Sequence, residues 1–280
     1  MTLQEKITWN INSSFELGWK PDIFGLDKID EKFIDEVTKF QKEMSLDQDG
    51  LFGPVTYRIK RTELESQKQE FIWCSGKKVP IAWPKVITMG EPGSFQTQNY
   101  STNSTRKPKE FVVHWDACLS SASCADVLKQ RGLSVHFCID NDGTIYQMVD
   151  CQNIAWHAGT ANAVSIGVEV SNAFYVKYND TYIKRGFGAR PILKNTKVNG
   201  GVIKEHLDFY DIQKQALSVL IKTVCSFYGI PLVVPKENGV MASGEVFDVK
   251  MNKFNGVVCH YHITKDKIDC AGLDLENLIK

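Results

Sequence analysis

Near its C-terminus the chain reads His260-Tyr261-His262-Ile263-Thr264-Lys265-Asp266-Lys267-Ile268-Asp269-Cys270-Ala271-Gly272. A short apolar run, residues 256–259, precedes this stretch and predicts a buried strand with His260 at its end. Zinc binds imidazole nitrogen together with thiolate or carboxylate. The stretch therefore suggests metal ligands at His260 and at Asp269 or Cys270, whereas the alternative is a polar loop with an incidental histidine.

A second histidine stands in the same kind of position. Residues 111–113 are apolar and predict a strand that ends at His114. Two histidines that leave neighbouring strand ends could converge on one metal ion. Together with the Asp269-Cys270 pair, they favour the metal interpretation over a structural one.

The rest of the C-terminal region alternates between strand and helix patterns. Further strands are predicted at 135–139, 144–149 and 165–170, and helices at 120–130 and 211–228. Residues 175–208 are polar and aromatic without a clear period, and we expect an excursion over the surface. The pattern indicates an α/β domain over residues 108–280, with a mixed central sheet flanked by helices.

The N-terminal region has a different pattern. Residues 31–44 predict an amphipathic helix, and a further helix is expected to begin at Pro54. We expect a small all-α three-helix module over residues 1–66, joined by a linker with edge strands over residues 67–107. The series Val37…Phe40-Gln41…Asp49-Gly50-Leu51-Phe52-Gly53-Pro54-Val55-Thr56 resembles the small peptidoglycan-binding module of bacterial and phage wall hydrolases. A three-helix spacer without binding function is the alternative.

Composition excludes several classes of protein. The chain has 280 residues, of which 43% are hydrophobic, as is usual for a globular protein. Its 33 basic and 33 acidic side chains balance, so we expect no nucleic-acid partner. No apolar run is long enough for a membrane span, and the first residues lack the apolar core of a secretory signal peptide. The eight cysteines are accordingly expected to be reduced thiols.

Several C-terminal segments resemble, in order, the zinc-dependent N-acetylmuramoyl-L-alanine amidase family, kin of the peptidoglycan recognition proteins. They are Val112-Val113-His114, residues 134–147, Ala155-Trp156-His157-Ala158-Gly159 with Asn162, Ser165-Ile166-Gly167-Val168-Glu169, and residues 258–272. The resemblance implies that family's fold, a Zn²⁺ cofactor, peptidoglycan as partner, and hydrolysis of the amide between N-acetylmuramic acid and L-alanine. The departures are the long stretch 175–208, Cys259 where glycine is commoner, and Ala271 where proline is usual.

The resemblance and the chemistry of amide hydrolysis together suggest roles for individual residues. Glu169, on an otherwise apolar strand, is the candidate general base, and its alternative is an edge-strand surface glutamate. Lys267 is the candidate cation for the oxyanion. Trp156, His157 and Asn162 are expected to line the substrate cleft.

The third zinc ligand, after His114 and His260, is chosen between two neighbours. Asp269 follows Lys267 by two residues, whereas Cys270 directly precedes a small residue and glycine, as the ligand does in the family. Neighbouring side chains on an extended backbone point in opposite directions, so only one is expected to ligate. We predict Cys270, because it keeps the ten-residue step from His260 that family members use and because thiolate is the softer donor. Asp269 is then its partner or substitute.

A modular wall hydrolase without a signal peptide resembles a phage endolysin, which accumulates in the host cytoplasm before release to the cell wall. The alternative is a peptidoglycan recognition protein that has kept the fold and lost catalysis. The presence of every candidate ligand together with Glu169 favours the enzyme. A thiol-redox protein is disfavoured because the sequence has no Cys-x-x-Cys motif.

Overall fold

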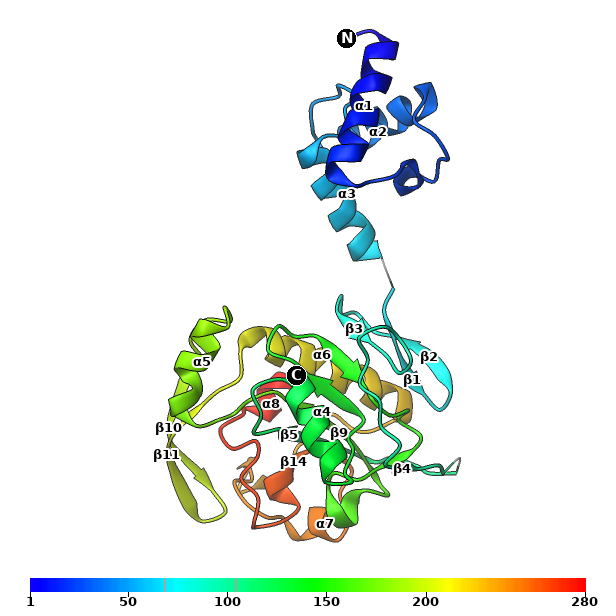
Figure 1. The fold of residues 1–280 in the computed structure, drawn as a ribbon. Coiled ribbons are helices and arrows are strands. Elements are labelled where there is room, and N and C mark those ends of the chain that lie inside the picture. Colours follow the sequence, from blue (N-terminus) through cyan, green and yellow to red (C-terminus); the bar gives the residue numbers. More distant parts are fainter. Residues whose placement is uncertain (68, 104) are drawn as a thin grey trace. The chain divides into compact units, whose positions relative to one another are not determined.

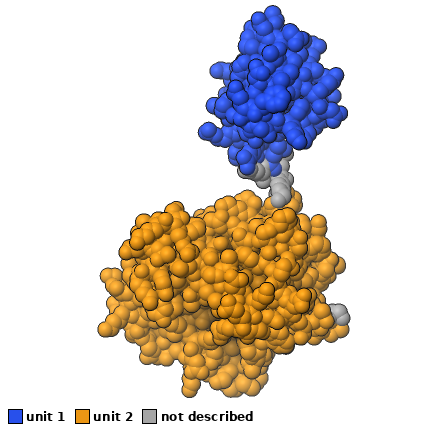
Figure 2. Space-filling model, viewed as in Figure 1, with its two compact units in different colours: residues 1–68 blue, residues 69–280 orange. Residues whose placement is uncertain are grey.

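The computed structural model describes residues 1–67, 69–103 and 105–280. The chain divides into two compact units, Met1–Lys68 and Gln69–Lys280, called unit 1 and unit 2 below (Figure 2). Lys68 and Ser104 belong to the predicted linker over residues 67–107 and lie outside the described residues.

Unit 1 consists of helices. They are α1 (Leu3–Leu17), the 3₁₀ turn η1 (Pro21–Phe24), α2 (Glu31–Glu43) and α3 (Pro54–Gln67). The predictions of a helix over residues 31–44 and of a helix start at Pro54 are confirmed. The aromatic side chains of Trp19, Phe33 and Phe52 form the centre of the core, with Trp19 stacked on Phe33 at 5.3 Å between ring centroids.

Helix α1 had no sequence signal because its buried residues are polar. Only Asn10 and Ser13 of this helix are buried, so it lacks the apolar stripe of an amphipathic helix. The Asn10 side chain instead donates to the Gly50 carbonyl at 2.9 Å and accepts from the Phe52 amide at 2.7 Å. Ser13 donates to the Phe52 carbonyl at 2.8 Å. These bonds attach α1 to the loop between α2 and α3.

Several residues on which the resemblance to a wall-binding module rests, Gln41, Asp49 and Gly50, hold this loop in its conformation. The Gln41 side chain donates to Asp49 Oδ1 at 2.7 Å and accepts from the Gly50 amide at 2.9 Å. Gly50 has a φ of 72°, and a Cβ there would lie 2.7 Å from Ile34 Cγ2. Glycine is therefore required at this position both by its backbone angle and by the space available. The Gln-Asp-Gly signature specifies the fold of the loop.

Unit 2 is built on a six-stranded sheet with the order β14-β5-β9-β6-β7-β3 (Figure 1). The strands are β3 (Val86–Ile87), β5 (Glu110–Trp115), β6 (Phe137–Ile139), β7 (Ile145–Gln147), β9 (Ser165–Val170) and β14 (Gly256–Cys259). All neighbours are parallel except β6 and β7, which form the predicted hairpin. The predicted mixed central sheet is thus confirmed.

Helices cover both faces of this sheet. Helix α6 (Asp211–Tyr228), predicted with these bounds, packs through Leu217 and Leu220 into the same core cluster as Phe111 and Val113 of β5. Helix α4 (Ser121–Gln130) packs in a second cluster with Cys138 of β6. Alternation along β5 turns Val112 and His114 to the face opposite α6, and Val112 packs there with Val258 of β14. His114 therefore faces away from the main core.

The remaining elements are short. They are β1 (Phe71–Cys74) paired with β2 (Lys77–Pro80), β4 (Tyr100–Ser101) with β8 (Ile154–Ala155), β12 (Lys236–Glu237) with β13 (Val240–Met241), the 3₁₀ turns η2 (Gly159–Ala161) and η4 (His260–His262), and helices α7 (Phe247–Lys250) and α8 (Leu275–Leu278). All eight cysteines are free thiols, as expected. None of the helices in the described part of the chain is long and apolar enough to cross a membrane.

Residues 175–208 have regular secondary structure that the sequence did not indicate. The segment contains η3 (Val176–Tyr178), α5 (Asn179–Lys184) and an antiparallel hairpin of β10 (Ile192–Val198) and β11 (Gly201–Leu207). Asn199 and Gly200 form its turn, with φ angles of 48° and 75°, as Asn-Gly prefers in two-residue hairpin turns. Because most residues of both strands are exposed or half-buried, the segment lacks a continuous apolar face. For this reason the sequence of the segment shows no hydrophobic periodicity from which its strands could be predicted.

The buried Glu110, at the start of β5, is expected to make the free energy of unfolding depend on pH. It is fully buried, and neither carboxylate oxygen has a hydrogen-bond partner among the described residues. Burial raises the pKa of Glu110 to about 7, against a smaller opposing effect of Lys109. The folded state therefore keeps a proton that the unfolded state loses above its ordinary pKa of 4.5, so this group weakens the fold as pH rises from 4.5 to 7. The loss is on the order of 2–3 kcal/mol.

Glu110→Gln should remove this pH dependence. The free energy of unfolding of the variant, relative to wild type, should increase by about 2–3 kcal/mol between pH 4.5 and 7.5, measured by urea denaturation of unit 2 within the full chain. Glu237→Gln, at an exposed position, is the matched control. Parallel pH profiles for Glu110→Gln and wild type would contradict the prediction.

Candidate metal centre and cleft

Two adjacent parallel strands bring the predicted histidines together. Val113 of β5 pairs with Cys259 of β14, so His114 and His260 follow at equivalent positions at the C-terminal edge of the sheet. His260 is the first residue of η4, where the chain leaves the sheet. Strand register alone thus places the two imidazoles side by side, as the sequence predicted.

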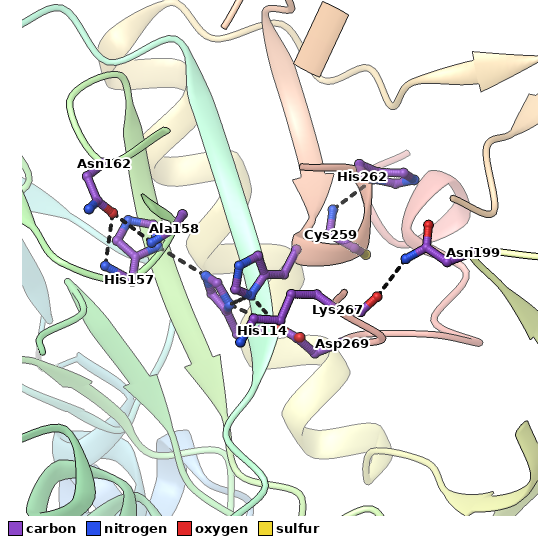
Figure 3. A network of polar contacts seen from close by, with 10 residues as sticks. His114, His157, Ala158, Asn162, Asn199, Cys259, His262, Lys267 and Asp269 are labelled. Carbon is purple, nitrogen blue, oxygen red and sulfur yellow. Dashed lines mark hydrogen bonds and ion pairs between the residues drawn. The ribbon is translucent and has the colours of Figure 1, made fainter. Parts of the chain in front are cut away.

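The two imidazoles and one carboxylate form a compact donor set (Figure 3). Nδ1 of His114 lies 3.0 Å from Nδ1 of His260, and each of these nitrogens lies 3.0 Å from Oδ2 of Asp269. The side chains are buried, with exposed fractions of 2% for His114 and 8% for both His260 and Asp269. Within the described ranges this is the one group of His, Cys, Asp and Glu residues close enough to hold a metal ion.

The structure places Asp269, and not the predicted ligand Cys270, beside the two histidines. Cys270 is fully buried in the main core cluster, together with Leu273 and Tyr261. Its thiol interacts with that of Cys259. The Asp269 carboxylate faces the histidines, because its Oδ2 lies 3.0 Å from Nδ1 of each ring. The sequence favoured Cys270 by its spacing and its softer thiolate. The backbone, however, brings the Asp269 carboxylate to the histidines.

The charges of the set match a cation site. Burial and, to a smaller extent, the neighbouring His260 lower the pKa of His114 to about 4 despite the opposing effect of Asp269, so the ring is neutral at neutral pH. Burial alone would raise the pKa of Asp269, but hydrogen bonds with His114 and His260 outweigh it and hold that pKa below its usual range. The neutral imidazole of His114 and the carboxylate of Asp269 are therefore available as metal donors near neutral pH, beside the His260 ring.

Glu169 is the neighbour of His114 in the sheet. The two residues pair in register on β9 and β5, so their side chains extend from the same face. Because β9 lies between β5 and β6, Glu169 is on a central strand, which excludes the edge-strand alternative. Its Oε2 is buried without a hydrogen-bond partner among the described residues. Burial, together with the nearby Asp269 carboxylate, raises the pKa of Glu169 well above its ordinary value.

His157 contacts both the cleft and the metal centre. Its Nδ1 lies 3.0 Å from Nε2 of His114, and its Nε2 lies 3.3 Å from the Ser165 hydroxyl. If Nδ1 of His114 faces a metal, its Nε2 carries the proton and donates to His157, whose own proton then points to Ser165. The ring lies so close to Gly167 that a Cβ there would be 2.4 Å from it. The sequence assigned His157 only to the cleft and missed this bond, although Gly167 was a local signal for close packing.

We expect His157→Ala to weaken metal binding by about 10- to 100-fold, the usual effect of losing a partner that orients a ligand. His157→Asn should partly restore affinity because its side-chain oxygen can accept the same hydrogen bond. Competition with a chromogenic chelator measures the dissociation constants. Equal affinities for wild type and His157→Ala would show that His114 needs no such partner.

A cleft of about 910 Å³ opens beside the donor set. Trp156, His157 and Asn162 line it on one side, and His260 and Lys267 on the other. Trp156 is 38% exposed and offers an aromatic face to a ligand. Asn162 has a further role that the sequence did not indicate, because its Oδ1 accepts from the amides of His157 and Ala158 at 3.0 and 2.6 Å. It fixes the segment that carries His157.

A comparison with known protein families identifies the family of this chain. A family model described as N-acetylmuramoyl-L-alanine amidase matches residues 104–269, more than half of the chain. The chain belongs to the N-acetylmuramoyl-L-alanine amidase family. The matched range includes His114, His260, Asp269 and Glu169. The family assignment made from the sequence is thereby confirmed.

Solved structures similar to this amidase have low sequence identity. N-acetylmuramoyl-L-alanine amidase LysC from Clostridium intestinale URNW has 18% identity and a TM-score of 0.40, over 70% of this chain and 95% of that one. A mutant endolysin from Bacillus subtilis has 20% identity and a TM-score of 0.36, over 70% and 99%. The amidase AmiD from E. coli, in complex with an anhydro-N-acetylmuramic acid peptide substrate, has 21% identity and a TM-score of 0.33, over 48% and 55%. No curated protein matches the chain.

Proposed function

We propose that this amidase is zinc-dependent and cleaves the bond between N-acetylmuramic acid and L-alanine in peptidoglycan. The observation that carries the proposal is the donor set of His114, His260 and Asp269 beside a cleft that His260 lines. Glu169 is the sheet neighbour of His114, and its Oε2 has no hydrogen-bond partner among the described residues. A hydrolase of this kind needs three protein ligands, an open fourth position and a nearby proton acceptor.

The donors fit zinc in type and spacing. Zinc prefers about four donors, and ligands about 2.0–2.1 Å from a tetrahedral ion lie about 3.3 Å from each other. The separations of 3.0 Å between the three donor atoms are close to this value. The His114 nitrogen and the Asp269 oxygen are already deprotonated at neutral pH, so they bind such an ion without first losing protons.

Each residue of the chain has a distinct chemical task in the proposed reaction. When bound, zinc supplies a Lewis acid that polarises the amide carbonyl and makes a water nucleophilic near neutral pH. Glu169 accepts a proton at Oε2 from the attacking water and delivers it to the leaving amide nitrogen. A cation beside Glu169 favours its carboxylate form, against the effect of burial. The Lys267 ammonium, at the wall of the cleft, stabilises the negative charge that develops on the carbonyl oxygen.

The reaction is tested by chemical analysis of digested peptidoglycan. Purified sacculi incubated with the full chain should release new L-alanine amino termini, and a zinc chelator should stop the release until Zn²⁺ is added back. New reducing sugar ends without new amino termini would indicate a glycosidase and contradict the proposal. Binding to sacculi without any new terminus would instead support the alternative, a non-catalytic recognition protein.

We further propose that unit 1 binds the cell wall. Its surface has a groove of about 340 Å³ lined by Trp9, Leu46, Leu51 and Pro54, beside the loop fixed by Gln41. An aromatic and aliphatic groove of this kind suits the face of a sugar or a short peptide. Residues 1–67 alone, once shown by circular dichroism to be helical, should sediment with intact sacculi. A folded fragment that stays in the supernatant would favour the spacer interpretation.

The same proposal includes the role of a phage endolysin that stays in the host cytoplasm until the membrane is permeabilised. The eight free cysteines suit a reducing compartment. Cells that express the chain should remain intact until a pore-forming agent is added, and then lyse. Lysis without such an agent would contradict this localisation.

A further inference from the structure

The hairpin of β10 and β11 contacts the segment that carries Lys267 and Asp269. We call residues 264–272 the ligand loop. At the tip of the hairpin, the Asn199 side-chain nitrogen donates to the Lys267 carbonyl at 2.7 Å (Figure 3). The Asn199 Oδ1 accepts from the Glu245 amide at 2.8 Å, and its backbone amide donates to the Ser243 carbonyl at 2.8 Å. One residue thus connects the hairpin turn, the loop at 243–245 and the ligand loop.

A second contact lies at the other end of the ligand loop. Gly272 has a φ of 84°, and a Cβ there would lie 2.7 Å from Leu193 Cδ1 and 3.4 Å from the His206 ring. His206 is 1% exposed and is held by Thr196, whose hydroxyl lies 2.9 Å from its Nε2. The two strands of the hairpin therefore pack directly on Gly272. Asp269 lies between the two contacts, two residues after Lys267 and three before Gly272.

The ligand loop has little regular structure of its own. It lies between η4 and α8, and its backbone bonds include turns such as Lys267 to Thr264 at 3.2 Å and Ala271 to Ile268 at 2.7 Å. Turns of this kind cost little to distort, whereas a metal ligand displaced by about 1 Å no longer meets its ion. External contacts at both ends are a physical means to hold the Asp269 carboxylate against the two histidines.

We propose that the β10–β11 hairpin clamps the ligand loop, and that Asn199 is a positioning residue for Asp269 and Lys267. The inference rests on the proposed role of these two residues in a zinc amidase. The proposal assigns a role to the β10–β11 hairpin, none of whose residues takes part in the proposed reaction. Asn199 suits the position because asparagine tolerates its φ of 48° and supplies both a donor and an acceptor.

The test compares Asn199→Gly and Asn199→Asp in the full chain. Glycine keeps the turn angle but removes both side-chain bonds, whereas aspartate keeps the acceptor for Glu245 and loses the donor to Lys267. Asn195→Gly is the matched control, because Asn195 is exposed on the same hairpin and has a φ of 53°. If Asn199→Gly gives little folded protein, Asn199→Asp carries the test.

Both Asn199 variants should weaken zinc binding by about tenfold or more in chelator competition and lower kcat more than they raise KM. In the metal-free protein, hydrogen exchange should become faster in residues 264–272 and stay unchanged in β5 and β9. Asn195→Gly should match wild type throughout. If the Asn199 variants bound zinc as tightly as wild type and exchanged hydrogen in residues 264–272 at the wild-type rate, the proposal that the hairpin clamps the ligand loop would be refuted. A wild-type chain that binds no zinc and releases no L-alanine termini would refute the proposed function, while the exchange measurement would still decide whether the hairpin orders the loop.

Discussion

Glu169→Gln is expected to lower kcat for peptidoglycan hydrolysis by about 10²-fold or more, the usual effect of losing a general base. Glutamine keeps the shape of the side chain but cannot accept the proton of the attacking water. Because Glu169 is not one of the three clustered donors, the variant should retain stoichiometric zinc. Single-turnover release of L-alanine termini and elemental analysis of the same preparation measure the two quantities.

Glu110→Gln is the matched control for this experiment. Glu110 is also a buried glutamate, and it lies on the same face of β5 as His114, four residues earlier. Its substitution should change stability and leave kcat within about twofold. If Glu169→Gln kept wild-type turnover with its zinc in place, another group would have to act as the base.

Asp269→Ala should remove the bound zinc and all measurable activity. Loss of a direct ligand should weaken zinc binding by more than the 10- to 100-fold expected for the partner His157. The two imidazoles would remain beside each other, but two neutral donors hold a divalent ion poorly. Chelator competition gives the dissociation constant, and the increase in unfolding temperature on adding Zn²⁺, present in wild type, should vanish.

Cys270→Ala tests the competing ligand. The substitution removes the thiol from the core beside Cys259 and creates a small cavity, so it should lower stability and leave zinc affinity unchanged. Retention of zinc by Asp269→Ala and its loss from Cys270→Ala would reverse the assignment. The experiment therefore decides between the donor chosen from the sequence and the donor that the structure presents.

Much of the fold followed from local patterns. The helix over residues 211–228 was predicted with its observed bounds, because its apolar period and the following Gly229 are both local signals. The strand that carries Glu169 was likewise predicted over residues 165–170. Helix α1 was not predicted, because its buried Asn10 and Ser13 gain their partners only from the loop at 50–52.

The sequence by itself determined the two histidines of the centre, because each follows an apolar strand and parallel strands end at the same edge of a sheet. It also determined Glu169 as the candidate base. Which of Asp269 and Cys270 faces the histidines depends on the tertiary structure, because the path of the ligand loop sets the direction of each side chain. The same holds for the bond of His157 to His114 and for the contact of Asn199 with Lys267, which join residues 43 and 68 positions apart. Local patterns report periodicity and turns, whereas contacts between distant segments depend on how the whole chain packs.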